Sequence, residues 1–176
     1  MLIPLTAQSR SASDFTIGLS YYGELLTHPG FKIFADYSFA HFDNSSLDFR
    51  LNFGLYNHPE YSHAFFLLPE LVYHLESETG LFFEPSIGAG WLIQAPDAYV
   101  VSYDESGFSQ TTGLRHYFMP SASVRGGVDI LLPNTDEIGF AAAFTGFWQY
   151  PFNNQWLVHP AVELECRYSF SKKDQN

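Results

Sequence analysis

Histidine and carboxylate side chains are the groups in this sequence with the greatest capacity for chemistry. Three histidines precede a proline, in His28-Pro29, His58-Pro59 and His159-Pro160. Imidazole and carboxylate together bind zinc and related divalent cations. The candidates for such a site are His28, His58, His63, His116 and His159, with Glu24, Glu60, Asp97, Asp104 and Glu105 as acidic partners. No two of these histidines have the spacing of a known metal motif, so we expect no bound cofactor and hold the histidines as candidates only.

A histidine base beside a serine hydroxyl is a second chemical possibility. A nucleophilic hydroxyl needs a base within hydrogen-bond reach, and the base needs a third group that orients it. His116 lies close in sequence to Ser121 and Ser123. His159 lies four residues before Glu163. The alternative is that these serines fill a crowded interior and take no part in catalysis.

The elements that must position these groups are strands, because apolar and polar residues alternate along almost the whole chain. In residues 162–170 one face carries Val162, Leu164, Cys166, Tyr168 and Phe170, and the other carries Glu163, Glu165, Arg167 and Ser169. A helix would not separate these sets, because it repeats every 3.6 residues. The alternation predicts strands at 15–26, 31–42, 47–57, 63–76, 81–94, 114–131, 138–150 and 156–170. A long loop at 95–113 interrupts them.

The predicted strands are long and joined by short turns. Strands in soluble proteins average about 5–6 residues, whereas a tilted membrane-spanning strand needs roughly 9–11. An even number of antiparallel strands closes without free edges. The sequence therefore predicts an all-β fold, a transmembrane up-and-down antiparallel β-barrel of about eight strands. Pro69, Pro85, Pro120 and Pro160 fall inside strands and leave the register open there, including a change of side near Met119-Pro120.

Side-chain size indicates which face of the barrel points outward. One face carries bulky apolar residues such as Phe49, Leu51 and Phe53, far more than an eight-stranded interior can hold. The opposite face carries Gly, Ser and Ala with charges between them. We therefore predict a lipid-facing apolar surface and a lumen charge network. The network consists of Asp36, Asp48, Arg50, Glu70, Glu84, Arg125, Asp129, Glu163, Glu165 and Arg167.

Two alternatives stay open: whether the lumen is a pore or is closed, and whether the barrel is soluble instead of membrane-spanning. The lumen charges either line a narrow pore or close it as a salt-bridged plug, and eight-stranded lumens are usually filled by side chains. A soluble lipocalin-like barrel would instead hold its apolar face inside, around a ligand. Histidines near a barrel end are also consistent with amphipathic rings in the interfacial belt of a membrane.

Composition supports a membrane protein and excludes other classes. Charged residues are 15% of the 176 residues, against about 25% in a typical soluble domain, and aromatic residues reach 18%. The net charge of −11 argues against nucleic acid as a partner. The single cysteine, Cys166, excludes an internal disulfide. Residues 1–8 have the features of a signal-peptide remnant, with Leu5-Thr6-Ala7 as a small-residue cleavage site, which leaves residues 9–176 as one domain.

On these features the chain resembles the small OmpA/OmpX-type outer-membrane barrels over residues 15–170. The strand Val162 to Phe170 is similar to the terminal signal that the barrel-assembly machinery reads, although six residues follow Phe170. The stretch from Tyr21-Tyr22-Gly23-Glu24 to His28-Pro29-Gly30 is similar to small barrels of Bacteroidota. The resemblance implies a Gram-negative outer membrane, with the bilayer and lipopolysaccharide as surroundings. It also implies short periplasmic turns and the long loop outside the cell.

The family hosts several roles, so the fold alone does not decide the function. We predict a non-enzymatic barrel with a structural or protein-interaction role, as an accessory subunit of an envelope complex. Its contacts would come from the extracellular rim and the 95–113 loop, and the binding residues would be Tyr99, Tyr103, Asp104, Glu105 and Phe108. The alternative is a lipid-modifying enzyme similar to lipid A deacylases, whose His-x-Ser arrangement is absent here.

Overall fold

Long antiparallel strands make up almost all of the structure. The computed structural model describes residues 14–24, 28–58, 62–96, 100–104, 107–111, 113–133, 136–152 and 155–170. The strands are β1 (Phe15–Glu24), β2 (His28–Phe42), β3 (Ser45–His58), β4 (Ser62–Glu76), β5 (Leu81–Pro96), β6 (Val100–Asp104), β7 (Gly107–Thr111), β8 (Arg115–Leu131), β9 (Glu137–Phe152) and β10 (Gln155–Phe170). Within these residues no helix is long and apolar enough to span a membrane.

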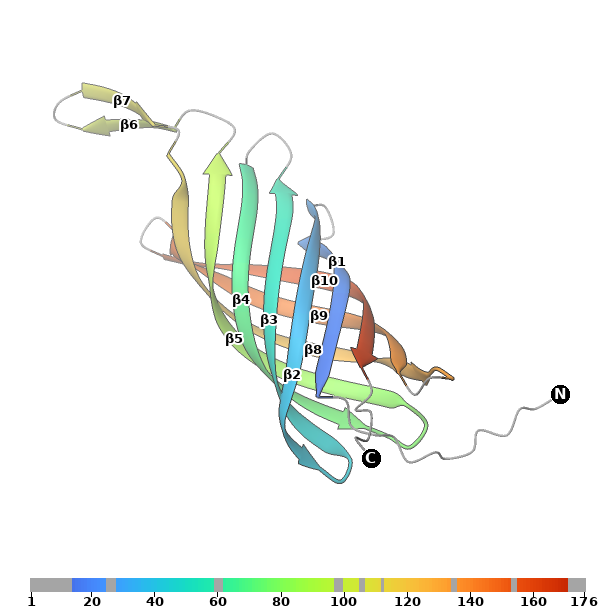
Figure 1. Cartoon of the computed structure of the whole chain (residues 1–176). Coiled ribbons are helices and arrows are strands. Elements are labelled where there is room, and N and C mark those ends of the chain that lie inside the picture. The colour runs from blue at the N-terminus through green and yellow to red at the C-terminus, as the bar shows by residue number, and fades with distance from the viewer. Residues whose placement is uncertain are drawn as a thin grey trace.

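Eight of the strands close into a barrel in the order β1-β10-β9-β8-β5-β4-β3-β2 (Figure 1). Neighbours along the chain pair antiparallel, and β1 closes the ring on β10 from Phe15↔Phe170 to Glu24↔Ala161. Closure leaves no unpaired strand edge in the barrel. The predicted transmembrane up-and-down barrel is confirmed. We call the end with the β2–β3, β4–β5 and β8–β9 connections the turn end, and the opposite end the hairpin end.

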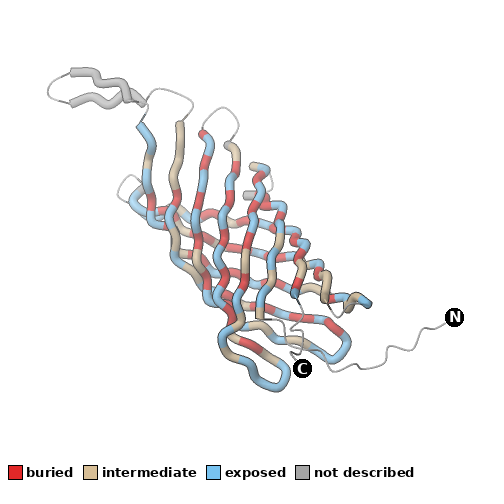
Figure 2. The backbone as a smooth tube through the Cα atoms, in the orientation of Figure 1, coloured by how far each residue is buried: buried red, intermediate tan, exposed pale blue. Residues whose placement is uncertain are grey.

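The apolar face of the strands points outward, as the side-chain sizes predicted. Exposed and buried residues alternate along the barrel strands (Figure 2). Ile87 is 65% exposed and Phe144 55% exposed, whereas charged residues such as Arg50 are completely buried. A soluble barrel with an apolar interior would have the opposite arrangement. The lipocalin-like alternative is therefore wrong.

Several strand ends differ from the prediction by one to three residues, and the starts of β2 and β3 are examples. We expected 27–30 to be a loop, but β2 begins at His28, and Pro29 pairs with Gly23 of β1. Proline is tolerated there because the β2–β3 ladder begins only at Gly30↔Tyr56. Ser45 and Ser46 belong to β3 because they pair with Leu75 and His74 of β4.

The prolines inside strands do not shift the register. Pro69 pairs with Leu51, Pro85 with Val124, Pro120 with Ala89 and Pro160 with Gly146, and the pairing on either side of each stays in step. The alternation also continues unbroken past Met119-Pro120, so no change of side occurs there. The shifts lie elsewhere, between Ser38 and Ala40 in β2 and between Gln155 and Leu157 in β10.

The interior of the barrel is more aromatic than the sequence predicted. Toward the hairpin end the lumen is filled by a cluster of buried residues, Tyr22, Tyr56, Ala64, Phe66, Leu68, Leu92, Tyr117, Met119, Phe147 and Ala161. Tyr22 lies at the centre of these rings, 5.3 Å from Phe66 between ring centroids. We call this cluster the aromatic layer. It corrects the expectation of a uniformly small and polar lumen.

Glycines facing the lumen make room for these rings. Gly54 pairs with Phe66, and a Cβ built on Gly54 would lie 2.2 Å from the Phe66 ring. Gly18 pairs with Phe34 in the same way, with a separation of 2.1 Å. A ring laid over a cross-strand glycine fills the lumen without a clash. The small residues of this face therefore serve large neighbours, which the composition of the face alone did not indicate.

Candidate functional site

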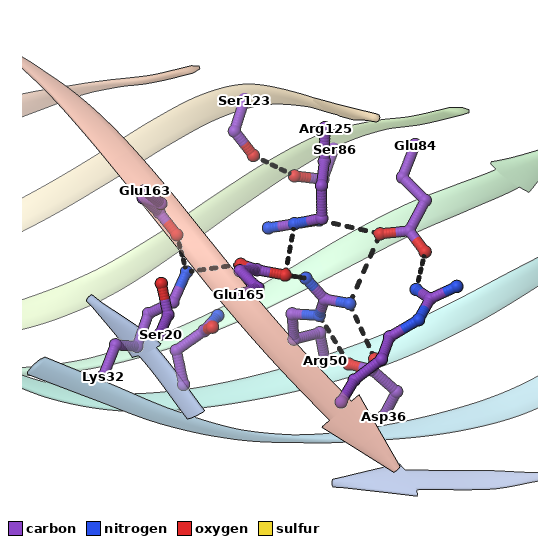
Figure 3. A network of polar contacts seen from close by, with 12 residues as sticks. Ser20, Lys32, Asp36, Arg50, Glu84, Ser86, Ser123, Arg125, Glu163 and Glu165 are labelled. Carbon is purple, nitrogen blue, oxygen red and sulfur yellow. Dashed lines mark hydrogen bonds and ion pairs between the residues drawn. The ribbon is translucent and has the colours of Figure 1, made fainter. Parts of the chain in front are cut away.

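Ion pairs fill the lumen between the aromatic layer and the turn end. Because side chains alternate along each strand, the charged residues of neighbouring strands all point inward, and barrel closure brings them together. The lumen charge cluster consists of Lys32, Asp36, Arg50, Glu84, Arg125, Asp129, Glu163, Glu165 and Arg167, all of them buried. Figure 3 shows the contacts from Lys32 to Glu84 as a continuous chain.

Glu84 of β5 is the centre of this cluster. Its carboxylate contacts Arg50 at 3.4 Å, Arg125 at 3.0 Å and the guanidinium of Arg167. The same carboxylate bonds to Nδ1 of His74 at 2.9 Å. Arg50 in turn makes two parallel bonds to Asp36, at 2.5 and 2.7 Å, the fork geometry that suits a carboxylate.

A second branch of the cluster runs through β10 to β2. Glu165 lies 2.8 Å from Nε of Arg125 and 3.4 Å from Nζ of Lys32. Lys32 also pairs with Glu163, which accepts a bond from Thr145 at 2.6 Å. Lys32 and Glu163 are 131 positions apart in sequence and meet only because β1 pairs with both β2 and β10.

Two phenylalanine rings cover arginines of the cluster. The Arg50 guanidinium lies 4.3 Å from the centroid of Phe34, and that of Arg167 lies 3.7 Å from the centroid of Phe82. A cation over a ring face is attracted by the ring quadrupole, more strongly where both are desolvated. At this level the lumen is occupied by buried ion pairs and rings, which is the arrangement expected of a salt-bridged plug.

Glu70 and Asp48 lie outside this cluster although both are buried. Glu70 accepts its hydrogen bonds from neutral groups, Asn52 at 2.9 Å and, more loosely, Ser86 and Ser121. Asp48 makes no ion pair with any described residue, and one of its carboxylate oxygens has no hydrogen-bond partner there. The ten residues expected in the lumen all line it. Eight of them share one network of ion pairs, and Asp48 and Glu70 do not.

Lys32 and His74 also face the lumen, although neither was predicted to do so. Both were open to the same reasoning, because Lys32 alternates with Phe31 and Ile33, and His74 with Tyr73 and Leu75, which point outward. His74 lies at the turn end, away from the five candidate histidines of the hairpin end.

The candidate histidines whose side chains are described do not gather into a site. His63 and His116 are exposed on the outer wall, where Trp91 donates a hydrogen bond to Nδ1 of His116 at 3.1 Å. His159 is buried in the lumen, bonded to Gln149 at 3.1 Å and stacked on Phe147. His28 is half-buried near the start of β2. The side chain of His58 lies outside the described part of the chain.

The candidate pairs of base and nucleophile are also separated. His116 is on the outer face of β8, and Ser121 and Ser123 are on its inner face, so the barrel wall lies between them. Ser123 bonds to Ser86 at 2.5 Å instead. His159 and Glu163 share the inner face of β10, but four residues of strand separate them by roughly 13 Å.

The expected binding loop contains a β-hairpin. Strands β6 and β7 pair from Val100↔Thr111 to Asp104↔Gly107 and form a two-stranded sheet separate from the barrel. Tyr103 and Phe108 are backbone partners in this ladder. Figure 1 shows the hairpin beyond the end of the barrel where β5 ends and β8 begins. Tyr99 and Glu105 lie outside the described residues, as do the side chains of Tyr103, Asp104 and Phe108.

Solved structures share this architecture. The N-terminal β-barrel domain of Pseudomonas aeruginosa OprF matches with a TM-score of 0.50 and 17% sequence identity, over 92% of this chain and 100% of that one. Neisserial surface protein A matches with a TM-score of 0.55 and 10% identity, over 91% of this chain and 98% of that one. No protein-family model and no curated protein sequence matches the chain. At these identities the likeness shows the fold, that of an outer-membrane β-barrel.

Proposed function

We propose that this chain is an OmpA/OmpX-type barrel of a Gram-negative outer membrane that acts through protein contacts at its hairpin end. The observation that carries the proposal is the β6–β7 hairpin, which pairs with itself and not with the barrel. A membrane strand needs roughly 9–11 residues to cross the bilayer. Both hairpin strands have five residues and lie between two barrel strands that already span it.

The filled lumen supports a role at the rim of the barrel. Arg50 and Arg125 are fully buried and contact carboxylates on both sides. The aromatic layer occupies the lumen on the hairpin side of these pairs. With both levels filled by side chains, we expect function to depend on the surfaces at the barrel ends and not on transport through the lumen.

The single long connection supports an orientation. The connection from β5 to β8, which carries the hairpin, has 18 residues, whereas the other connections at both ends have two to five. Bacterial barrels have short periplasmic turns and longer extracellular loops. The hairpin would then project outside the cell, with lipopolysaccharide and the bilayer around the barrel. As an accessory subunit of an envelope complex, the protein would bind its partner through this hairpin. An origin in Bacteroidota stays a prediction from residues 21–30.

The alternative of a lipid-modifying enzyme has less support. It required a histidine within hydrogen-bond reach of a serine, or of an orienting acid, on one face of the wall. His116 and the serines of β8 lie on opposite faces, and His159 bonds to Gln149. No observation on the described residues favours this activity over an interaction role.

The test removes the hairpin and leaves the barrel intact. Deleting residues 99–107 should leave the barrel folded, because β6 and β7 share no ladder with it. Proteins cross-linked to this chain in native membranes should be lost after the deletion. A control variant with alanine at Glu78 and Thr79, both exposed at the turn end, should retain them.

Folding of both variants is checked by their heat-dependent migration in detergent gels, and cross-linked partners are measured by quantitative mass spectrometry. If every cross-linked protein is kept at the wild-type level after the deletion, the hairpin does not make the contacts. The proposal would then be wrong.

A further inference from the structure

A histidine and two carboxylates meet at the turn end of the lumen, remote from the hairpin end. His74 and Glu76 lie two residues apart on β4 and therefore share its inward face. Asp129 points inward from β8, on the other side of β5. One ligand atom from each of the three lies within 4.8 Å of the others. No combination of the hairpin-end histidines does this among the described residues.

The imidazole of His74 is held in the orientation that a metal ligand requires. Its Nδ1 bonds to Glu84 at 2.9 Å, and its Nε2 faces Glu76 at 3.6 Å. In metal sites a ligating histidine almost always donates its other ring N–H to a carboxylate or carbonyl. That bond fixes the tautomer and the ring orientation. Glu84 supplies this carboxylate and is itself fixed by the arginines around it.

The backbones of the two acidic residues are also fixed. The Glu76 amide donates to the carbonyl of Asn44 at 3.0 Å, and the Asp129 amide donates to the carbonyl of Gly80 at 2.9 Å. These bonds tie both residues to the turns that close this end of the barrel. A binding site whose members are held by their surroundings needs little rearrangement on binding.

We propose that His74, Glu76 and Asp129 bind one first-row divalent metal cation, of the zinc or manganese type, at the turn end of the barrel. One imidazole and two carboxylates suit these ions better than calcium or magnesium, which prefer oxygen ligands alone. Zinc takes such ligands at ~2.0–2.2 Å, so small side-chain movements close the site. The proposal goes beyond the proposed function, because it concerns the opposite end of the molecule.

Charge and access at this position are compatible with a cation. Glu76 and Asp129 each bring a negative charge, and Glu84 lies directly behind His74. The positive charge of Arg167 offsets part of this negative charge, because Arg167 pairs with both Asp129 and Glu84. Both carboxylate oxygens of Asp129 accept a hydrogen bond from Arg167. A carboxylate has roughly four lone-pair sites, so Asp129 can keep both bonds and still ligate a metal. The side chains of His74 and Glu76 are 15% and 21% exposed, which leaves the metal open to solvent and to a water ligand.

The test titrates zinc chloride and manganese chloride into the full-length chain, refolded in detergent micelles, by isothermal titration calorimetry. We expect one cation per barrel for the wild type. His74→Gln and Glu76→Gln should each weaken metal binding at least about tenfold, since the loss of a group that only orients a ligand already costs about 10–100-fold. His116→Gln is the matched control, because His116 is exposed on the outer wall at the hairpin end, and it should bind as the wild type does.

The same samples are checked for heat-dependent gel migration, so that loss of the metal is separated from loss of the fold. Cobalt(II) gives a second readout, because its visible absorption bands should appear with the wild type and disappear with folded His74→Gln. Two results would overturn the proposal. One is no saturable binding by the wild type, and the other is binding that folded His74→Gln retains at the wild-type affinity.

Discussion

Neutralising Glu84 should destabilise the barrel more than neutralising any carboxylate outside the charge cluster. Its carboxylate contacts the guanidinium groups of Arg50, Arg125 and Arg167. In Glu84→Gln the amide keeps one acceptor oxygen but turns two N–H donors toward a group of cations. Removing one partner of a buried ion pair costs roughly 3–5 kcal/mol, because the remaining charge stays desolvated. Each arginine here keeps a second carboxylate, so we expect the free energy of unfolding to fall by about 3 kcal/mol.

Glu70→Gln is the matched control for this change. Glu70 is equally buried on the neighbouring strand, but its partners are the neutral groups of Asn52, Ser86 and Ser121. A glutamine oxygen can still accept the hydrogen bond from Asn52, so the free energy of unfolding should fall by no more than about 1.5 kcal/mol. The assay is urea unfolding of each variant in lipid vesicles, followed by tryptophan fluorescence and extrapolated to zero denaturant. Equal losses for Glu84→Gln and Glu70→Gln would refute the central role of Glu84.

Three further predictions concern the lumen and the wall. Gly18→Ala places a Cβ 2.1 Å from the Phe34 ring, which lies against Arg50, and should lower the free energy of unfolding by about 1–3 kcal/mol. Gly126→Ala is the control, because the nearest atom to its Cβ is 3.8 Å away, and it should change the free energy of unfolding by less than ~0.5 kcal/mol. Leu51→Arg, in the middle of β3, should lower the free energy of unfolding by ~2–4 kcal/mol. Leu81→Arg, at the start of β5, should lower it by no more than ~1 kcal/mol, because the cost of a lipid-facing charge falls from the middle of the bilayer to its surface. Urea unfolding in vesicles checks both pairs, and equal effects within a pair would contradict the reasoning. Finally, the wild-type chain in a planar bilayer should give no steady single-channel conductance, and regular open levels would show that the plug is not closed.

The alternation of the sequence was sufficient to predict the wall of the barrel. Which side of a strand a residue faces is a local property, since successive side chains point to opposite faces. Glu163 and Glu165 were therefore placed in the lumen, and Val162 and Leu164 outside, without knowledge of any pairing. The bulk of the apolar face then excluded an apolar interior.

The contents of the lumen could not be predicted to the same degree. The glycines at 18 and 54 suggested a small and polar interior, but each accommodates a phenylalanine of the next strand. Whether a glycine marks empty space or space for a neighbour depends on what lies opposite it. That information is in the register, which turn geometry and bulges such as the one at Ser38 and Ala40 determine.

The sequence by itself thus determined that the chain forms about eight membrane-spanning strands and which residues face lipid, because these follow from local alternation and length. Only the tertiary structure decided which inward residues meet. Lys32 reaches Glu163 through closure of the ring, and His74 reaches Asp129 across β5 through the register of three strands. Such contacts join positions far apart in the chain, where no local pattern records them. For this reason the histidines that the sequence offered as metal ligands lie at the hairpin end, whereas the metal site that we propose lies at the turn end.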